Sequence, residues 1–103
     1  MIDLTFIKGK ITYDDLSSLE NTDIYNQIDS LKEDLLQVEY PETYLLDVGW
    51  YPSFDINGSF HISAIKDYDW GAPLFFSTAK SVHALMMEIT AAQSCIRNSA
   101  MEN

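Results

Sequence analysis

The chain has 103 residues, of which 47% are hydrophobic and 13% aromatic, which is the size and apolar content of one domain with a single core. Its 16 Asp and Glu residues against 6 Lys and Arg give a formal net charge of −10, which argues against direct binding of nucleic acid or anionic membranes, because both need clustered cations. No apolar run approaches the roughly 20 residues of a membrane span, the start lacks a signal-peptide pattern, and Cys95 is the single cysteine, so we expect a soluble cytoplasmic protein.

The negative charge is unevenly distributed along the chain. Residues 1–42 contain ten acidic residues and three lysines, a net charge of −7, whereas the remaining 61 residues carry −3. No repeat, low-complexity tract or Gly/Ser-rich linker separates the two parts, so we expect residues 1–103 to form a single domain. The excess either keeps a small protein soluble or attracts a basic partner protein.

The first part of the chain is predicted to contain one short strand and two helical segments. Apolar and polar residues alternate over residues 2–6, which is typical of a half-buried strand, and Thr12 is a suitable N-cap for a first helical turn. A longer helix is predicted over residues 24–38, and Pro41 follows its end. Its apolar residues recur at steps of four and three: Ile24, Ile28, Leu31, Leu35 and Val38.

The rest of the chain is predicted to contain a β-hairpin, a third strand and a second helix. Strands over residues 43–51 and 59–66 have one apolar and one mixed face, and the pair Asn57-Gly58 supplies positive-φ turn residues between them. Residues 74–77 resemble a third strand, and apolar residues from Val82 to Ile96 recur at helical spacing. The predicted fold is α+β, with a small antiparallel sheet of three or four strands and two main helices packed on one face.

One loop resembles part of a calcium-binding site. Ser53, Asp55, Asn57 and Gly58 match positions one, three, five and six of a calcium-binding loop, but position twelve falls on Ala64, where a bidentate Glu is required. The Asp and Asn side chains are better explained by hydrogen bonds to their own backbone in a turn. We therefore expect no metal and no cofactor.

Catalytic chemistry has little support in the sequence. The chain contains no Gly-x-Ser-x-Gly elbow, no phosphate-binding glycine loop and no dinucleotide-binding fingerprint. His61 and Asp47 fall on the same, less apolar face of the predicted hairpin, where the histidine could act as a general base beside the carboxylate. A small enzyme that uses this pair is an alternative, but a structural or surface histidine is the commoner case, and we expect no catalytic residues.

Aromatic residues beside acidic ones indicate a protein interface. Aromatic side chains serve as anchors in such interfaces, and the charges around them steer a partner of opposite sign. We expect the acidic contacts with a basic partner to be Asp23, Asp29, Glu33, Asp34, Asp67 and Asp69. The expected aromatic contacts are Tyr51, Phe54, Tyr68 and Trp70.

Residues 46–82, LDVGWYPSFDINGSFHISAIKDYDWGAPLFFSTAKSV, resemble small bacterial immunity proteins encoded beside polymorphic toxins, in particular those of contact-dependent growth inhibition systems. The similar features are Gly49-Trp50-Tyr51-Pro52, the turn from Asp55 to Phe60, Asp69-Trp70, and Pro73-Leu74 before a closing helix. The resemblance implies a non-enzymatic inhibitor that binds the C-terminal toxin domain in the cytoplasm and blocks its active site or substrate surface. Many such toxins are nucleases with basic clefts, which suit an acidic inhibitor.

The resemblance transfers no catalytic residues, and toxin-contacting positions vary within such families, so the contacts named above depend on charge alone. We expect a monomer that forms a 1:1 heterodimer with its toxin domain and binds neither nucleic acid nor membrane directly. A third class of function is also open, an adaptor that associates with itself through a sheet edge.

Overall fold

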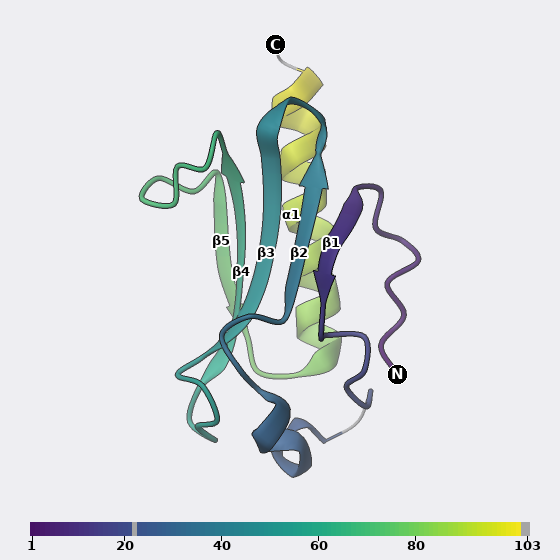
Figure 1. Cartoon of the computed structure of the whole chain (residues 1–103), viewed down its shortest axis with the longest axis vertical. Coiled ribbons are helices and arrows are strands. Elements are labelled where there is room, and N and C mark those ends of the chain that lie inside the picture. Colours follow the sequence, from purple (N-terminus) through teal and green to yellow (C-terminus); the bar gives the residue numbers. More distant parts are fainter. Residues whose placement is uncertain (22, 102–103) are drawn as a thin grey trace.

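Five antiparallel strands form one sheet in which each strand pairs with its neighbours in the sequence (Figure 1). The computed structural model describes residues 1–21 and 23–101. The strands are β1 (Lys10–Asp14), β2 (Leu36–Tyr40), β3 (Tyr44–Tyr51), β4 (Ser59–Lys66) and β5 (Phe75–Ala79), in the spatial order β1-β2-β3-β4-β5. The helix α1 (Val82–Met101) covers one face, and two short 3-10 helices, η1 (Ile24–Ser30) and η2 (Pro41–Thr43), lie in the connections.

The fold is α+β as predicted, but the sheet has five strands rather than three or four. One main helix, rather than two, packs on it. Figure 1 looks onto the sheet with α1 behind it, so the face towards the viewer is not covered by a helix. We call this the open face, and it carries the candidate site described below.

The core fills the space between α1 and the sheet. The side chains of α1 that are buried there recur at helical spacing, as predicted: Val82, Leu85, Ile89, Ala92 and Ile96. The Ser81 side chain caps this helix by accepting a hydrogen bond from the Ala84 amide at 3.1 Å. In the described part of the chain, no helix has the length and apolar character needed to cross a bilayer.

The β3–β4 hairpin is confirmed, including its two faces. Trp50 and Phe60 are cross-strand partners on the covered face, fully buried and packed edge to face with ring centroids 5.0 Å apart. The expected positive φ at the Asn57-Gly58 pair is wrong, because the loop takes its positive φ (59°) at Phe54. Gly58 is instead required by close packing, since a Cβ there would lie 2.6 Å from Nε1 of Trp50.

The helix predicted over residues 24–38 is wrong. Asp23 caps the 3-10 helix η1, which ends at Ser30, and the chain then runs beside β3 before β2 begins. The Trp50 amide donates to the Lys32 carbonyl at 2.8 Å, and the Leu35 amide donates to the Val48 carbonyl at 3.1 Å. Strand β3 therefore satisfies backbone groups that a helix would have satisfied internally. The apolar spacing still predicted burial: Ile24, Leu31, Leu35 and Val38 are buried, and Ile28 is partly buried.

The first 20 residues also differ from prediction. Residues 2–6 form no strand, although Ile2 and Leu4 are buried while Asp3 and Thr5 are exposed. Thr12 lies within β1 and starts no helical turn. The turn that follows β1 is held by the Asp14 side chain, which accepts hydrogen bonds from the amides of Leu16 and Ser17.

Candidate functional site

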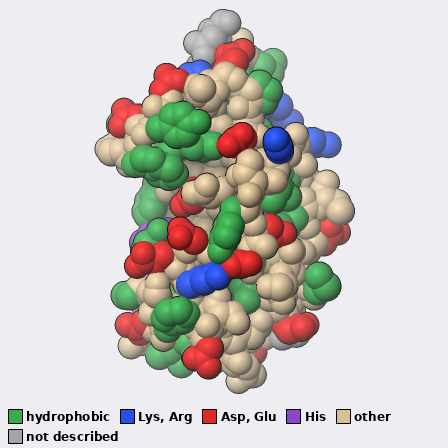
Figure 2. Space-filling model, viewed as in Figure 1, with side chains coloured by type: hydrophobic (Ala, Val, Ile, Leu, Met, Phe, Trp, Pro, Cys, Tyr) green, Lys and Arg blue, Asp and Glu red, His purple; other side chains and the backbone are tan. Residues whose placement is uncertain are grey.

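A groove of about 400 Å³ lies on the open face of the sheet. Figure 2 shows this face, where acidic and hydrophobic side chains are intermixed. We call this feature the open-face groove, and it is lined by Asp34, Gln37, Asp47, Tyr51, His61, Ser63, Trp70 and Phe76. The lining includes two carboxylates and neither Lys nor Arg.

The strand register places one row of side chains across the whole sheet. Gln37 pairs with Asp47, Asp47 with Ser63, and Ser63 with Phe76. Tyr13 of β1 pairs with Gln37, so the row includes a residue from every strand of the sheet. Tyr13 also lines a smaller adjoining hollow with Asp34 and Gln37. Because side chains alternate between the faces of a strand, all five members of the row project from the open face.

Asp34 reaches the groove through a close backbone crossing at Gly49. A Cβ at position 49 would lie 1.9 Å from the carbonyl oxygen of Glu33, so only glycine allows this approach. The hydrogen bonds of Lys32 and Leu35 to β3 hold the two ends of the crossing segment. The Glu33–Asp34 pair is therefore carried over the strand and towards the row of open-face side chains.

Three aromatic rings pack against one another on the β5 side of the groove. The His61 ring lies between Tyr51, at a centroid distance of 4.8 Å, and Phe76, at 5.3 Å with an edge-to-face orientation. Partial burial lowers the pKa of His61, so its imidazole is neutral at pH 7. Trp70, in the β4–β5 loop, adds a side chain that is 52% exposed. The groove thus offers aromatic surface next to carboxylates.

The two carboxylates of the groove repel each other. Burial raises the pKa of Asp47, and the charge of Asp34 raises it further, while the hydrogen bond that Gln37 Nε2 donates to Asp47 Oδ1 at 3.3 Å acts in the opposite direction. The pKa of Tyr51 is raised by burial and by the charges of Asp47, Glu33 and Asp34. Negative charge is therefore concentrated at this position, and a cation placed in the groove would be attracted.

The lysine two residues before Asp34 is engaged in an ion pair. Lys32 forms an ion pair with Asp15, and the Tyr13 hydroxyl donates to the same Asp15 carboxylate at 2.6 Å. These contacts lower the pKa of Asp15, chiefly through the Lys32 hydrogen bond. Lys32 is thus paired with Asp15 and does not line the groove that contains Asp34 and Asp47.

Three of the ten predicted contact residues line the open-face groove: Asp34, Tyr51 and Trp70. Glu33 lies beside them in the crossing segment. All ten are exposed except Tyr51, which is partly buried. The predicted contacts therefore lie on accessible surface, but they belong to three parts of it.

The second group lies at the end of the sheet near η1. Asp23 and Asp29 belong to this connection, and the Phe54 amide donates to the Leu31 carbonyl at 2.7 Å, which ties the β3–β4 loop to the end of η1. Phe54 is 57% exposed. The Asp23 carboxylate also has a structural role, because it accepts a hydrogen bond from the Tyr25 amide at 2.9 Å.

The third group is the β4–β5 loop, which leaves the opposite end of the hairpin (Figure 1). It contains Asp67, Tyr68 and Asp69, and Tyr68 is 60% exposed. Asp67 is partly committed to the fold, because the Thr43 hydroxyl donates to its carboxylate and its amide donates to the Thr43 carbonyl at 3.0 Å. Asp69 and Tyr68 extend the acidic and aromatic surface beyond Trp70.

The sequence analysis did not identify Tyr13, Gln37, Ser63 or Phe76 as site residues. The alternation of faces was readable within the β3–β4 hairpin, which contains Ser63. Tyr13 and Gln37 could not be assigned to a face, because β1 and β2 were not predicted as strands. The signal that could have found them is the alternation of Leu36, Val38 and Tyr40 with polar residues, which the helical interpretation of residues 24–38 hid.

His61 and Asp47 both line the groove, but each has other partners. Asp47 accepts from Gln37, whereas His61 packs between two aromatic rings. Within residues 1–21 and 23–101, no group of three or more metal-binding side chains is gathered. In the loop that resembles a calcium site, Asp55 Oδ1 accepts from the Asn57 amide at 2.8 Å, and its carbonyl accepts from Gly58 and from Nε1 of Trp50.

Comparison of the chain with protein-family models finds no match. Comparisons with curated proteins and with solved structures also find no significant match. Function is therefore inferred from the charge of the chain and from the chemistry of the open-face groove.

Proposed function

We propose that the protein is an immunity protein that binds and neutralises a cognate toxin domain, a basic nuclease, by covering its active site or substrate surface. The observation that carries the proposal is the open-face groove, where Asp34 and Asp47 lie beside exposed aromatic rings in a chain of net charge −10. Charge complementarity of this kind favours a cationic protein surface as the occupant.

The carboxylates supply the electrostatic part of the proposed interface. A nuclease holds phosphates with Lys and Arg side chains, and carboxylates can accept the same charge-assisted hydrogen bonds. The mutual repulsion of Asp34 and Asp47 is unfavourable in the free protein. A lysine or arginine of the toxin placed between them removes that penalty, so part of the binding free energy comes from relief of the repulsion.

The aromatic residues supply the apolar part. Trp70 and Phe76 are 52% and 54% exposed, which is high for such large side chains beside a groove. Aromatic side chains dominate the energetics of protein interfaces when they become buried. Phe54 and Tyr68 lie in the two loops of the β3–β4–β5 segment, so they are placed to extend contact beyond the groove.

The region that resembles immunity proteins, residues 46–82, includes most of β3 and all of β4 and β5. It contributes Asp47, Tyr51, His61, Ser63, Trp70 and Phe76 to the groove. Asp34 and Gln37 come from the more acidic first part of the chain. In the proposed complex one copy of this protein binds one toxin domain in the cytoplasm, without direct contact to nucleic acid or membrane.

The proposal places the cognate toxin domain in the reading frame directly upstream, and the test is co-expression of the two. We expect the protein to restore growth and to co-purify with the toxin domain. The single variants Asp34→Asn and Asp47→Asn should each weaken binding by about tenfold or more. Glu88→Gln is the matched control, because it also removes one negative charge but lies on α1, on the other side of the sheet.

Two outcomes would contradict the proposal. Growth arrest that persists during co-expression would argue against neutralisation of this toxin. Equal affinities for the Asp34→Asn, Asp47→Asn and Glu88→Gln variants would show that net charge, rather than the groove, determines binding.

A further inference from the structure

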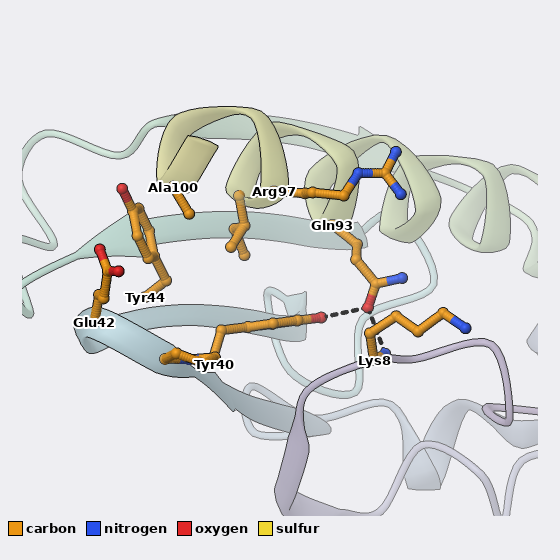
Figure 3. Close-up of a pocket in the computed structure, with 9 residues that line it drawn as sticks. Lys8, Tyr40, Glu42, Tyr44, Gln93, Arg97 and Ala100 are labelled. Carbon is orange, nitrogen blue, oxygen red and sulfur yellow. Dashed lines mark hydrogen bonds between the residues drawn. The ribbon is translucent and has the colours of Figure 1, made fainter. Parts of the chain in front are cut away.

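A second cavity, of about 240 Å³, lies where the β2–β3 turn meets the last turns of α1 (Figure 3). It is separate from the open-face groove, because α1 residues form one of its walls. Its lining is mostly apolar and consists of Lys8, Tyr40, Pro41, Glu42, Tyr44, Gln93, Ile96, Arg97 and Ala100.

The helical side of this cavity is a single face of α1. Gln93, Ile96, Arg97 and Ala100 follow the i, i+3, i+4, i+7 spacing that aligns side chains along one side of a helix. The opposite side comes from the end of the β2–β3 hairpin, where Tyr40 and Tyr44 are cross-strand partners. Ala100 has a small side chain at the position where the helix passes the tyrosines, so space is left between them (Figure 3).

Gln93 fixes the geometry of the cavity. Its Oε1 accepts hydrogen bonds from the Tyr40 hydroxyl and from the Lys8 amide, both at 2.7 Å, and its Nε2 donates to the Phe6 carbonyl at 3.2 Å. The N-terminal segment, β2 and α1 are thereby joined at one side chain. Burial raises the pKa of Tyr40 to about 12, so its ring and neutral hydroxyl form part of the wall at neutral pH.

Positive charge gathers at this cavity in an otherwise acidic chain. Two of the 6 Lys and Arg residues, Lys8 and Arg97, line it, and neither forms an ion pair with a residue in the described part of the chain. Figure 3 shows both side chains extending on the Gln93 side, whereas Glu42, the only carboxylate of the lining, lies at the other end near Tyr44. A third cation, Lys66, lies 4.2 Å from the centroid of the Tyr44 ring.

We propose that this cavity binds a small aromatic carboxylate. The ring would lie between the two tyrosines and the Ile96–Ala100 side of α1, and the carboxylate would meet Lys8 and Arg97. A neutral apolar ligand would leave these two cations without a partner, and a cationic ligand would be repelled by them. The volume is below the roughly 300–1,000 Å³ of sites that hold drug-sized ligands, which limits the ligand to about one ring system.

The test compares 3-phenylpropionate with 3-phenylpropan-1-ol, which has a hydroxyl in place of the carboxylate. Each is titrated to about 10 mM into the ¹⁵N-labelled protein, so that even millimolar affinity is detected. We expect shifts of the backbone amides in residues 40–44 and 93–100. The carboxylate should bind about three- to fivefold more tightly than the alcohol, as expected for exposed ion pairs.

Variants locate the binding and separate its two parts. Arg97→Gln and Lys8→Gln should remove the preference for the carboxylate, whereas Lys80→Gln, an exposed lysine just before α1, should retain it. Ala100→Leu should fill the cavity and abolish binding of both compounds while the remaining amide spectrum is preserved. Equal affinity for the two compounds, shifts elsewhere in the spectrum, absence of shifts at 40–44 and 93–100, or unchanged binding to Ala100→Leu would each overturn the proposal.

Discussion

Asp34 and Asp47 line the same groove, and the charge of Asp34 is one of the two causes that raise the pKa of Asp47. The larger cause is the burial of Asp47 beneath its neighbours on the open face. A carboxyl group whose pKa is raised in the folded state binds protons there that the unfolded state has already released. Its ionisation therefore opposes folding, and this cost is fully present above the folded pKa.

The first prediction concerns the stability of Asp47→Asn. Removal of the charge should raise the free energy of unfolding at pH 7, because the amide of asparagine can still accept a hydrogen bond from Gln37 and is not repelled by Asp34. The gain should shrink as the pH falls through the raised pKa and disappear below the ordinary pKa of aspartate. Urea denaturation at several pH values measures it. A variant less stable than the native chain at pH 7 would contradict the stated origin of the shift.

The second prediction concerns the crossing at Gly49. Gly49→Ala places a methyl group against the Glu33 carbonyl, and because the clash involves backbone, side-chain rotation cannot relieve it. We expect a loss of about 1–3 kcal/mol in the free energy of unfolding. Gly71→Ala is the control, since a Cβ there would approach only Asp69 Oδ1, at 3.8 Å. Equal stability of the two variants would show that the close approach of the Glu33 backbone to Gly49 does not contribute to folding.

The third prediction distinguishes a binding protein from an enzyme that uses His61. His61→Phe keeps an aromatic ring between Tyr51 and Phe76 but removes the titratable nitrogens. The variant should still protect growth, and its affinity for the toxin domain should stay within about threefold of the native value. The reason is that the phenyl ring keeps most of the contact area of the imidazole ring. Purified native protein that turns over a substrate, with the activity lost in His61→Phe, would favour the enzymatic alternative.

The fourth prediction is a salt dependence of association. If the carboxylates steer a basic toxin domain, the association rate constant should fall by about tenfold or more between low and high ionic strength, because salt screens long-range attraction. Stopped-flow fluorescence can follow the reaction, because Trp70 lines the groove and is exposed in the free protein. The slope should be smaller for the Asp34→Asn/Asp47→Asn double variant. A rate that does not respond to salt would assign the acidic surface to solubility alone.

The parts of the fold that were predictable are those with a single interpretation of their apolar pattern. In the β3–β4 hairpin every second residue from Leu46 to Trp50 and from Phe60 to Ala64 is fully buried, and α1 repeats its apolar residues through several turns, so local pattern and tertiary structure agree. Residues 24–38 are different, because their apolar steps of three and four fit an α-helix, whereas the alternation that starts at Leu36 fits a strand. There the pairing with β3, which no local pattern reveals, decided the outcome.

The candidate site was only partly predictable for the same reason. Composition identified acidic and aromatic residues, and ten of them were expected to meet a partner. Their grouping depends on the pairing of strands far apart in the sequence, which brings Gln37 beside Asp47 and Ser63 beside Phe76. The role of Gly49 depends on a segment that crosses it from residues 32–35, so it could not be recognised before the backbone path was known.

The meander order of the sheet keeps the paired strands apart from the loops that connect them. Each strand is joined to its immediate neighbour, so the connections lie at the two ends of the sheet while the row from Tyr13 to Phe76 runs across its middle. Loops at such ends tolerate changes in length and sequence far better than paired strands do. Changes in the β3–β4 and β4–β5 loops could therefore alter the contact surface at either end of the sheet without disturbing the strand pairing that holds the fold.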